Sequence, residues 1–213
     1  TQAYTLGTGL KSHQGKNVIT LNVFAQQVQL NQDNYLTLTG LNSSWLNNLS
    51  QKSSLQLYLR LSNQDYDQQP TSDASTVLLG GSYSQKVSIN YAPVLIAGLY
   101  LARDDSKLST DASRESTERD YFGVNLGAML GLSDKLSAQL SLRYKDTEYD
   151  MLSSFTGKTR QDDNFTQTLN FIWRLDRHWV LSAKASVIKN NSNVELFEHD
   201  RMVLSTNLRY KLK

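Results

Sequence analysis

Residues 202–212 read MVLSTNLRYKL, and this stretch decides the fold class. Its even-numbered positions are apolar apart from Thr206 and the amphipathic Tyr210, whereas its odd-numbered positions are polar apart from Val203. Successive side chains of a β-strand point to opposite faces, so a period of two predicts a strand with one apolar and one polar face. The end of the chain is therefore expected to be such a strand.

Ten further segments alternate in the same way, so we expect about eleven strands, and no segment shows a capped helical stripe. Many of these strands would be ten residues or longer. Ordinary strands have about 5–6 residues, whereas a tilted membrane-spanning strand needs about 9–11. The sequence therefore predicts an all-β fold, an antiparallel transmembrane β-barrel of about 10–12 strands. The ten segments are residues 2–12, 17–30, 35–46, 55–62, 75–87, 93–104, 121–132, 136–145, 165–174 and 179–188.

A soluble β-sandwich would give the same alternation, but two features favour the membrane barrel. Long polar connections alternate with short ones such as 132–135 and 175–178, as in barrels with long external loops and short periplasmic turns. Aromatic residues also gather near the expected strand ends, as interfacial rings do, although the core of a sandwich would account for them too. They are Tyr35, Trp45, Tyr121, Phe122, Tyr144, Tyr149, Phe165, Trp173, Trp179, Phe197 and Tyr210.

The composition narrows the function classes. The chain has 213 residues and no Cys, which excludes disulfide scaffolds, thiolate zinc sites, iron–sulfur clusters and cysteine nucleophiles. Its 22 Lys and Arg nearly balance 20 Asp and Glu, so no nucleic-acid partner is expected. The longest apolar run, residues 92–102, is shorter than the roughly 20 residues of a membrane-spanning helix.

The strand count has a consequence for chain direction. If the carboxy terminus is periplasmic, counting back through the connections makes the first strand run inward and begin outside the cell. A free-standing bacterial barrel has an even strand number with both ends in the periplasm. We therefore expect residues 1–213 to form a single outer-membrane β-barrel domain that lacks an amino-terminal strand.

The last residues of the chain resemble the carboxy-terminal signal read by the barrel-insertion machinery, which is therefore an expected partner. The signal positions fall on Ser205, Asn207, Tyr210 and Leu212. The sequence departs from the usual signal at Asn207, where Gly is common, and by ending on Lys213 after Leu212.

Residues 97–107, 119–150 and 160–210 resemble the carboxy-terminal barrel of tetratricopeptide-containing outer-membrane proteins. That group includes the surface lipoprotein assembly modifiers and is similar in plan to exopolysaccharide export porins. The most specific pieces are RDYFG at 119–123 and NSN at 191–193, followed by Asp200 and Arg201. The resemblance covers about the final two-thirds of the chain. It implies upstream periplasmic helical repeats and a role in moving a macromolecule to the cell surface.

Seven cationic residues on the expected strands are interpreted as falling on the parity opposite the apolar one, and a charge facing hydrocarbon would cost about 2–4 kcal/mol near the midplane. We therefore predict that they line the barrel lumen. Two interpretations stay open: a lining for an anionic polysaccharide or other anions, and a set of ion pairs that holds the wall together. The residues are Arg60, Arg103, Arg143, Lys145, Arg174, Lys184 and Arg209.

Enzymatic chemistry is not expected. His199 and Asp200, near Glu195 and Glu198, are the only adjacent acid–base candidates, and a solvated rim is the simpler interpretation. The three histidines lack metal-ligand spacing, so we predict no metal, no cofactor and no catalytic residue. Acidic clusters in expected outer loops would be solvated or would meet lipopolysaccharide through divalent cations. They are Asp65/Asp67/Asp73, Asp104/Asp105 and Asp162/Asp163.

These observations predict a protein of the bacterial outer membrane whose surroundings are membrane lipid and lipopolysaccharide. The first hypothesis is a passive conduit that exports a macromolecule, either a surface lipoprotein or a polysaccharide. The alternatives are a narrow barrel filled by side chains, with structural or adhesive loops, and a general porin. A hydrolase with a site at the rim is the least favoured class.

Overall fold

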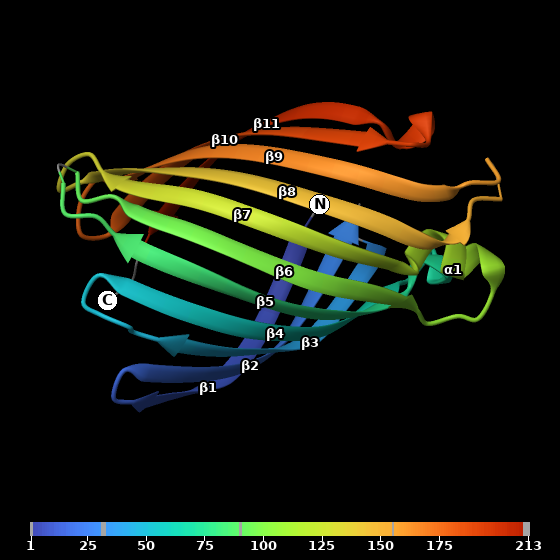
Figure 1. The fold of residues 1–213 in the computed structure, drawn as a ribbon, viewed down its shortest axis with the longest axis horizontal. Helices are drawn as coiled ribbons and strands as arrows, with labels where there is room; N and C mark the ends of the chain where they lie inside the picture. Colours follow the sequence, from blue (N-terminus) through green and yellow to red (C-terminus); the bar gives the residue numbers. More distant parts are fainter. Residues whose placement is uncertain (1, 31–32, 90, 155, 211–213) are drawn as a thin grey trace.

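The computed structural model describes residues 2–210 except 31–32, 90 and 155, and it contains one antiparallel sheet of eleven strands (Figure 1). Each strand pairs with its neighbours in the chain, and the sheet curves so that its first strands lie behind the middle ones. The strands are β1 (Gln2–Gln14), β2 (Asn17–Leu30), β3 (Asp33–Asn47), β4 (Ser53–Tyr66), β5 (Ala74–Lys86), β6 (Val94–Ser106), β7 (Arg119–Gly131), β8 (Leu136–Leu152), β9 (Thr159–Arg174), β10 (Trp179–Ser192) and β11 (His199–Tyr210).

The predicted all-β antiparallel fold is confirmed, and each expected strand corresponds to one of β1–β11. Most strands are longer than expected, and their lengths run from 12 residues in β11 to 17 in β8. β4, β6 and β8 continue through polar residues that look like loop in the sequence, because backbone pairing does not require apolar side chains. Placing the acidic clusters in loops was therefore wrong in part. The acids that lie in strands are Asp65, Asp104, Asp105, Asp162 and Asp163.

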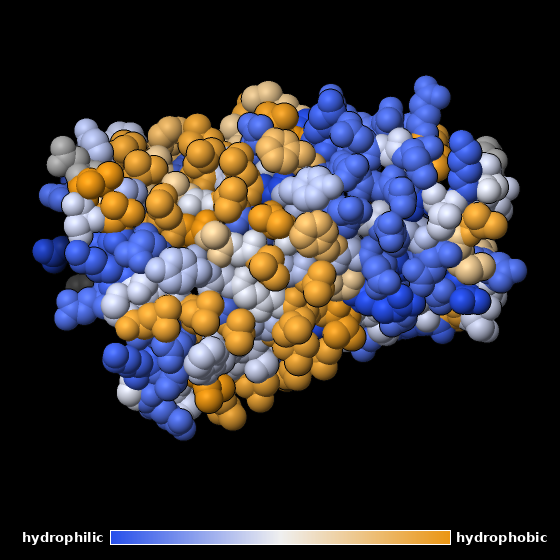
Figure 2. Space-filling model, viewed as in Figure 1, coloured by the Kyte–Doolittle hydropathy of each residue, from blue (hydrophilic) through white to orange (hydrophobic). Residues whose placement is uncertain are grey.

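The apolar side of each strand forms the outer surface. Leu57, Leu79 and Leu99 are 46%, 58% and 60% exposed, and they share one face of β4–β6. Figure 2 shows an apolar band across the strands and a hydrophilic end beyond it. Within the described ranges, no helix combines the length and apolar character needed to cross a membrane.

The connections divide the molecule into two ends. The turn end carries residues 15–16, 48–52, 87–93, 132–135 and 175–178. The loop end carries residues 67–73, 107–118, 153–158 and 193–198, with the short helices η1 (Pro70–Ser72), α1 (Asp111–Thr117) and η2 (Glu195–Phe197). In membrane barrels the long loops face outward and the short turns face the periplasm, so these ends are the two membrane sides.

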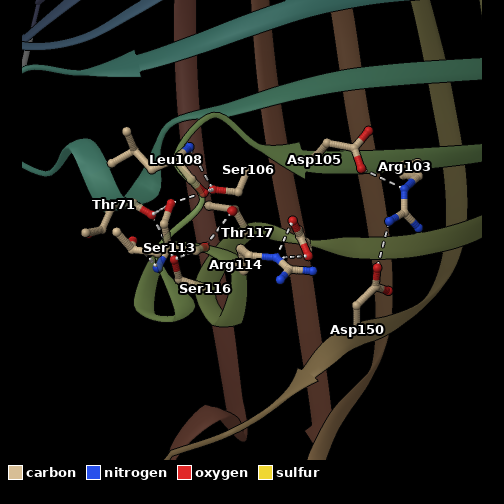
Figure 3. Close-up of polar contacts among 12 residues, drawn as sticks. Thr71, Arg103, Asp105, Ser106, Leu108, Ser113, Arg114, Ser116, Thr117 and Asp150 are labelled. Carbon is tan, nitrogen blue, oxygen red and sulfur yellow. Dashed lines mark hydrogen bonds and ion pairs between the residues drawn. The ribbon is translucent and has the colours of Figure 1, made fainter.

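Helix α1 was not expected, because a polar helix of 7 residues has no apolar stripe to reveal it. The Thr110 side chain caps its first turn by accepting from the Ser113 backbone N–H. The Ser113 side chain is fully buried, and its hydroxyl and that of Ser116 both donate to the carbonyl of Thr71, at 2.9 Å each (Figure 3). The helix therefore joins the loops at 67–73 and 107–118.

The two outermost strands each have one partner. β1 pairs with β2 and β11 pairs with β10, and both outermost strands are exposed along their whole length. Among the described residues, no pairing joins β1 to β11. The prediction that a further strand precedes residue 1 stays a prediction.

Aromatic rings on the inner face lie over glycines of the next strand. A Cβ atom at Gly80 would stand 2.4 Å from the ring of Tyr58, and one at Gly123 would stand 2.3 Å from the ring of Tyr100. All four residues belong to one row of register partners across β4–β7. The glycines thus let the rings lie against the wall instead of projecting from it.

Candidate functional site

The inner face is polar, and the register places six of the seven predicted lumen cations on it. Arg60 pairs in register with Asn42 and Leu78, on the face opposite Leu59 and Leu61. The other five lie in the same way on β8–β11, opposite the apolar parity of their own strands. That these side chains line an open lumen stays a prediction. They are Arg143, Lys145, Arg174, Lys184 and Arg209.

The assignment of Arg103 to the inner face is wrong. Arg103 shares its parity with Leu99 and Leu101, and it lies opposite Val77 on the outer surface. The residue stands near the loop end of β6, beyond the apolar band, where a charge is not opposed by hydrocarbon. The rule that charges avoid the outer face therefore does not hold at this height.

Arg103 instead joins three strands through carboxylates. Its Nε donates to Asp105 at 2.7 Å, its Nη1 to Asp120 at 3.0 Å and its Nη2 to Asp150 at 2.7 Å. Figure 3 shows Arg103 between Asp105 of β6 and Asp150 of β8. The guanidinium is 43% exposed, so water screens this cluster and its effect on stability is modest.

The six inner cations lack such partners. Among the described residues, none of them lies within 4.0 Å of a carboxylate oxygen. In the described part of the chain, the Arg143 side chain donates to the Asn125 amide oxygen, at 3.0 Å, and to no other side chain. Arg60 lies over the Phe24 ring, 5.0 Å from its centroid, and its Nε is buried without a hydrogen-bond partner in the part of the chain that the structure describes.

The inner face near the loop end is organised differently. Asp104 is 2% exposed, and it accepts from the Thr76 hydroxyl at 2.7 Å and from Arg119 Nε at 2.8 Å. Arg119 also donates to the Tyr149 hydroxyl at 3.0 Å. Each polar group thus meets a partner on the next strand, from β5 to β8.

Arg160 extends this arrangement to β9. Its guanidinium lies over the Tyr149 ring at 4.5 Å and over the Phe197 ring at 3.3 Å, and it forms an ion pair with Asp162. We call the whole set the loop-end ladder. Its members are Thr76, Asp104, Arg119, Tyr149, Arg160 and Asp162.

From the sequence, Asp104 and Asp162 were assigned to loops and Tyr149 to an interfacial ring. That they form one network on the inner face was missed, because they fall where apolar alternation stops. A signal was nevertheless present. Arg119 shares the polar parity of Gly123 in its strand, and Arg160 and Asp162 share the parity of Thr166. Extending the parity count into the polar ends would have placed these charges inside.

The two residues considered for acid–base chemistry, His199 and Asp200, do not point toward a common site. His199 pairs with Asn190 on the inner face, whereas Asp200 pairs with Lys189 on the outer face, because neighbours in a strand point apart. Within the described ranges, no group of three or more His, Asp or Glu side chains could hold a metal ion. The absence of catalysis stays a prediction.

The predicted insertion signal lies on the edge strand β11. Ser205 and Asn207 are register partners of Lys184 and Ser182 on the inner face. Tyr210 faces outward, and its ring centroid lies 4.8 Å from that of Trp179. Leu212 lies outside the described residues. Recognition by the insertion machinery stays a prediction.

Comparisons with known proteins agree with this architecture. A family model described as surface lipoprotein assembly modifier matches residues 2–207. Among solved structures, the chain is similar to OmpT (in-vitro folded), an outer membrane protein of Vibrio cholerae, with a TM-score of 0.55 and 10% identity. The match covers 91% of this chain and 63% of that chain, and at this identity it supports the barrel fold alone. A search of curated proteins found no match.

Proposed function

Because the chain belongs to the surface lipoprotein assembly modifier family, we propose that its inner face conducts the polypeptide part of a lipoprotein across the membrane. The family and the barrel fold locate the protein in the bacterial outer membrane, and the family supports a role in surface lipoprotein assembly. The proposed direction runs from the turn end to the loop end. A polysaccharide is the alternative cargo.

The observation that carries this proposal is the set of inner cations without carboxylate partners. Unpaired charges in a dry interior are costly, so a wall whose charges only held it together would pair them, as the loop-end ladder does. Arg143 and Lys184 are surrounded by small polar neighbours such as Ser141, Thr168 and Ser186. Such a surface supports a hydrated interior.

The lipid part of the cargo would take a different route. Moving an acyl chain from an apolar to an aqueous environment costs a transfer free energy of about 0.8 kcal/mol for each CH₂ group. A polar, cationic inner face therefore disfavours the lipid, while the apolar outer face favours it. The proposed division sends the polypeptide along the inner face and keeps the acyl chains in the membrane.

The loop-end ladder supports a second candidate, a barrel filled by side chains. Asp104, Tyr149 and Asp162 are 2%, 6% and 7% exposed, so the interior at this end is packed. If the ladder never separates, the barrel is structural. If it separates during export, the ladder is the external gate. No cofactor and no covalent step are needed in either case.

Site-specific photocrosslinking in cells tests the proposal. A benzophenone side chain would be placed at Ser141 on the inner face and, as a matched control, at the adjacent Leu140 on the outer face. We expect crosslinks to a lipoprotein polypeptide from position 141 and not from position 140. Crosslinks from position 141 to a polysaccharide would show that the cargo is the polysaccharide and not the lipoprotein. Export of the lipoprotein without any crosslink from position 141 would rule out the route along the inner face.

A further inference from the structure

The nearly neutral net charge conceals an opposition between the two ends. At the turn end, ten charged residues lie in the turns or in the strand ends beside them. Eight of these ten residues are cationic. The two acids are Asp134 and Asp176. The eight cations, which we call the turn-end cations, are Lys11, Lys16, Lys52, Lys86, Lys135, Arg174, Arg177 and Arg209.

The other acids of the chain all lie toward the loop end. They occupy the loops and the loop-side halves of the strands, from Asp33 at the start of β3 to Asp200 at the start of β11. The protein therefore presents a cationic periplasmic side and an acidic external side. Neither its charge total nor its composition reveals this.

Some of the turn-end cations lie on the inner face, and the others belong to the turns. We call the inner face at this end, together with its turns, the turn-end mouth. Lys86 and Arg174 lie on the inner face of β5 and β9, and Lys135 and Arg177 belong to the turns themselves. Among the described residues, none of the eight forms an ion pair within 4.0 Å. Their charge is free to attract a partner.

The outer face at the same height is different. It carries Trp173, Trp179 and Tyr210, which are 50%, 39% and 50% exposed. Such aromatic side chains suit the headgroup boundary of the membrane. The cations on the inner face at this end, such as Lys86 and Arg174, thus point toward the interior and not toward the lipid headgroups around the wall.

A cavity opens among these groups. Its volume is about 220 Å³, and its lining includes the cations Lys135 and Arg174, the acid Asp134, and the apolar Val94 and Met129. The cations in the lining outnumber the acid by two to one. Cationic and apolar side chains meet in it. A carboxylate accompanied by a small apolar side chain matches this lining.

The adjoining turn at 87–93 adds exposed apolar groups on a strained backbone. Tyr91 and Ala92 have φ angles of 67° and 37°, which residues other than glycine rarely adopt. The Tyr91 carbonyl accepts from the Gly131 N–H at 3.2 Å, which ties the turn to β7. Tyr91 and Ile89 remain 61% and 66% exposed. Strain of this kind concentrates at binding sites.

We propose that the turn-end mouth binds an acidic polypeptide segment that carries apolar side chains. This inference rests on the proposed export function and names the chemistry of the segment that enters first. Opposite charge accelerates the encounter, while the cavity and the turn at 87–93 supply apolar contacts. The acidic loop end opposes stable binding of the same segment there, so the mouth is a docking site for entry.

The test uses the whole chain, folded and held in nanodiscs of zwitterionic phosphatidylcholine. The probe is a short fluorescent peptide of alternating Glu and Leu, followed by anisotropy, with empty nanodiscs as the blank. The mouth variant carries Lys86→Gln, Lys135→Gln and Arg174→Gln. The matched variant carries Lys158→Gln, Lys189→Gln and Arg201→Gln, which remove the same charge at the loop end. A heat-modifiable band on unboiled gels confirms that each is folded.

We expect the mouth variant to bind the probe about tenfold more weakly, and the matched variant to stay within about twofold of the unaltered chain. Added salt weakens binding, because it screens the charges of the mouth and of the probe. Equal losses in both variants, or no binding by the unaltered chain, would refute the proposal. Loss of binding in nanodiscs that contain phosphatidylglycerol would assign the mouth to anionic lipid instead. The binding assay involves no export. If the photocrosslinking experiment fails while the peptide still binds, the proposed translocation is refuted and the proposed docking site is not.

Discussion

The two halves of the inner face are built from similar residues and have opposite organisation. Near the loop end, Arg119 and Arg160 each meet a carboxylate and the Tyr149 side chain. Toward the turn end, Arg143 and Lys184 meet no carboxylate in the described ranges. One half is a polar core and the other is a polar surface. The presence of charges inside a barrel therefore does not by itself indicate an open path. Charges without carboxylate partners favour an open path, whereas paired charges favour a packed interior.

The largest effect is expected from breaking the loop-end ladder. Arg119→Gln leaves the buried Asp104 carboxylate without its cationic partner, which costs about 3–5 kcal/mol in similar buried pairs. Urea unfolding of the protein in detergent measures this loss. The control is Arg143→Gln, for which we expect a change within about 0.5 kcal/mol, because Arg143 has no buried charge as a partner. Equal losses in the two variants would erase the distinction between the halves.

The next effect lies at the boundary between the halves, where rings cover glycines. Gly123→Ala places a methyl group against the Tyr100 ring, and overpacking of this kind costs about 1–3 kcal/mol. Gly127→Ala in the same strand is the matched control, since its nearest neighbour is 3.5 Å away. Unfolding free energies are compared, and Tyr100→Ala is expected to restore part of the loss in the double variant. A larger loss at Gly127 would contradict the proposed packing of the rings.

A smaller effect is expected on ion passage. In planar bilayers, Arg143→Gln combined with Lys184→Gln should reduce the preference for anions over cations by roughly twofold, because both charges face the interior. The matched change is Arg103→Gln, which removes a cation from the outer surface and should leave selectivity unchanged. An unaltered selectivity in the double variant, or no current in any variant, would favour a filled barrel.

Some of this comparison could be predicted from the sequence. The period of two revealed every strand, because apolar residues on one parity follow directly from contact with lipid. The inner position of Arg143 and Lys184 follows from the same rule. The rule weakens where strands leave the hydrocarbon, so Arg103 was assigned to the wrong face, and the acids of β6 and β9 were taken for loop.

The ladder could not be predicted in the same way, because its contacts depend on register between strands. Asp104 and Arg119 are separated in the chain by a loop that contains α1, and nothing local in the sequence shows that they meet. The charge opposition of the two ends required only strand directions, which the alternation already supplies. It was hidden because a net charge sums over both ends.

The smallest effect concerns the turn end, where Asp176 holds the turn at 175–178. Its carboxylate accepts from the backbone N–H groups of Trp179 and His178, at 2.8 and 2.7 Å, and these bonds lower the pKa of Asp176 below its usual value. A lowered pKa means that the stabilisation is complete above the ordinary carboxyl pKa of about 3.9 and is lost as pH falls through the folded-state pKa.

The substitution Asp176→Asn keeps a hydrogen-bond acceptor at this position but removes the negative charge. The difference in unfolding midpoint between the unaltered chain and this variant should therefore be present at neutral pH and shrink in acid. Asp134→Asn in the turn at 132–135 is the control, because the Asp134 side chain accepts no hydrogen bond among the described residues and the Ser133 hydroxyl caps that turn. A pH-independent difference for Asp176→Asn would show that the negative charge of Asp176 does not stabilise the turn.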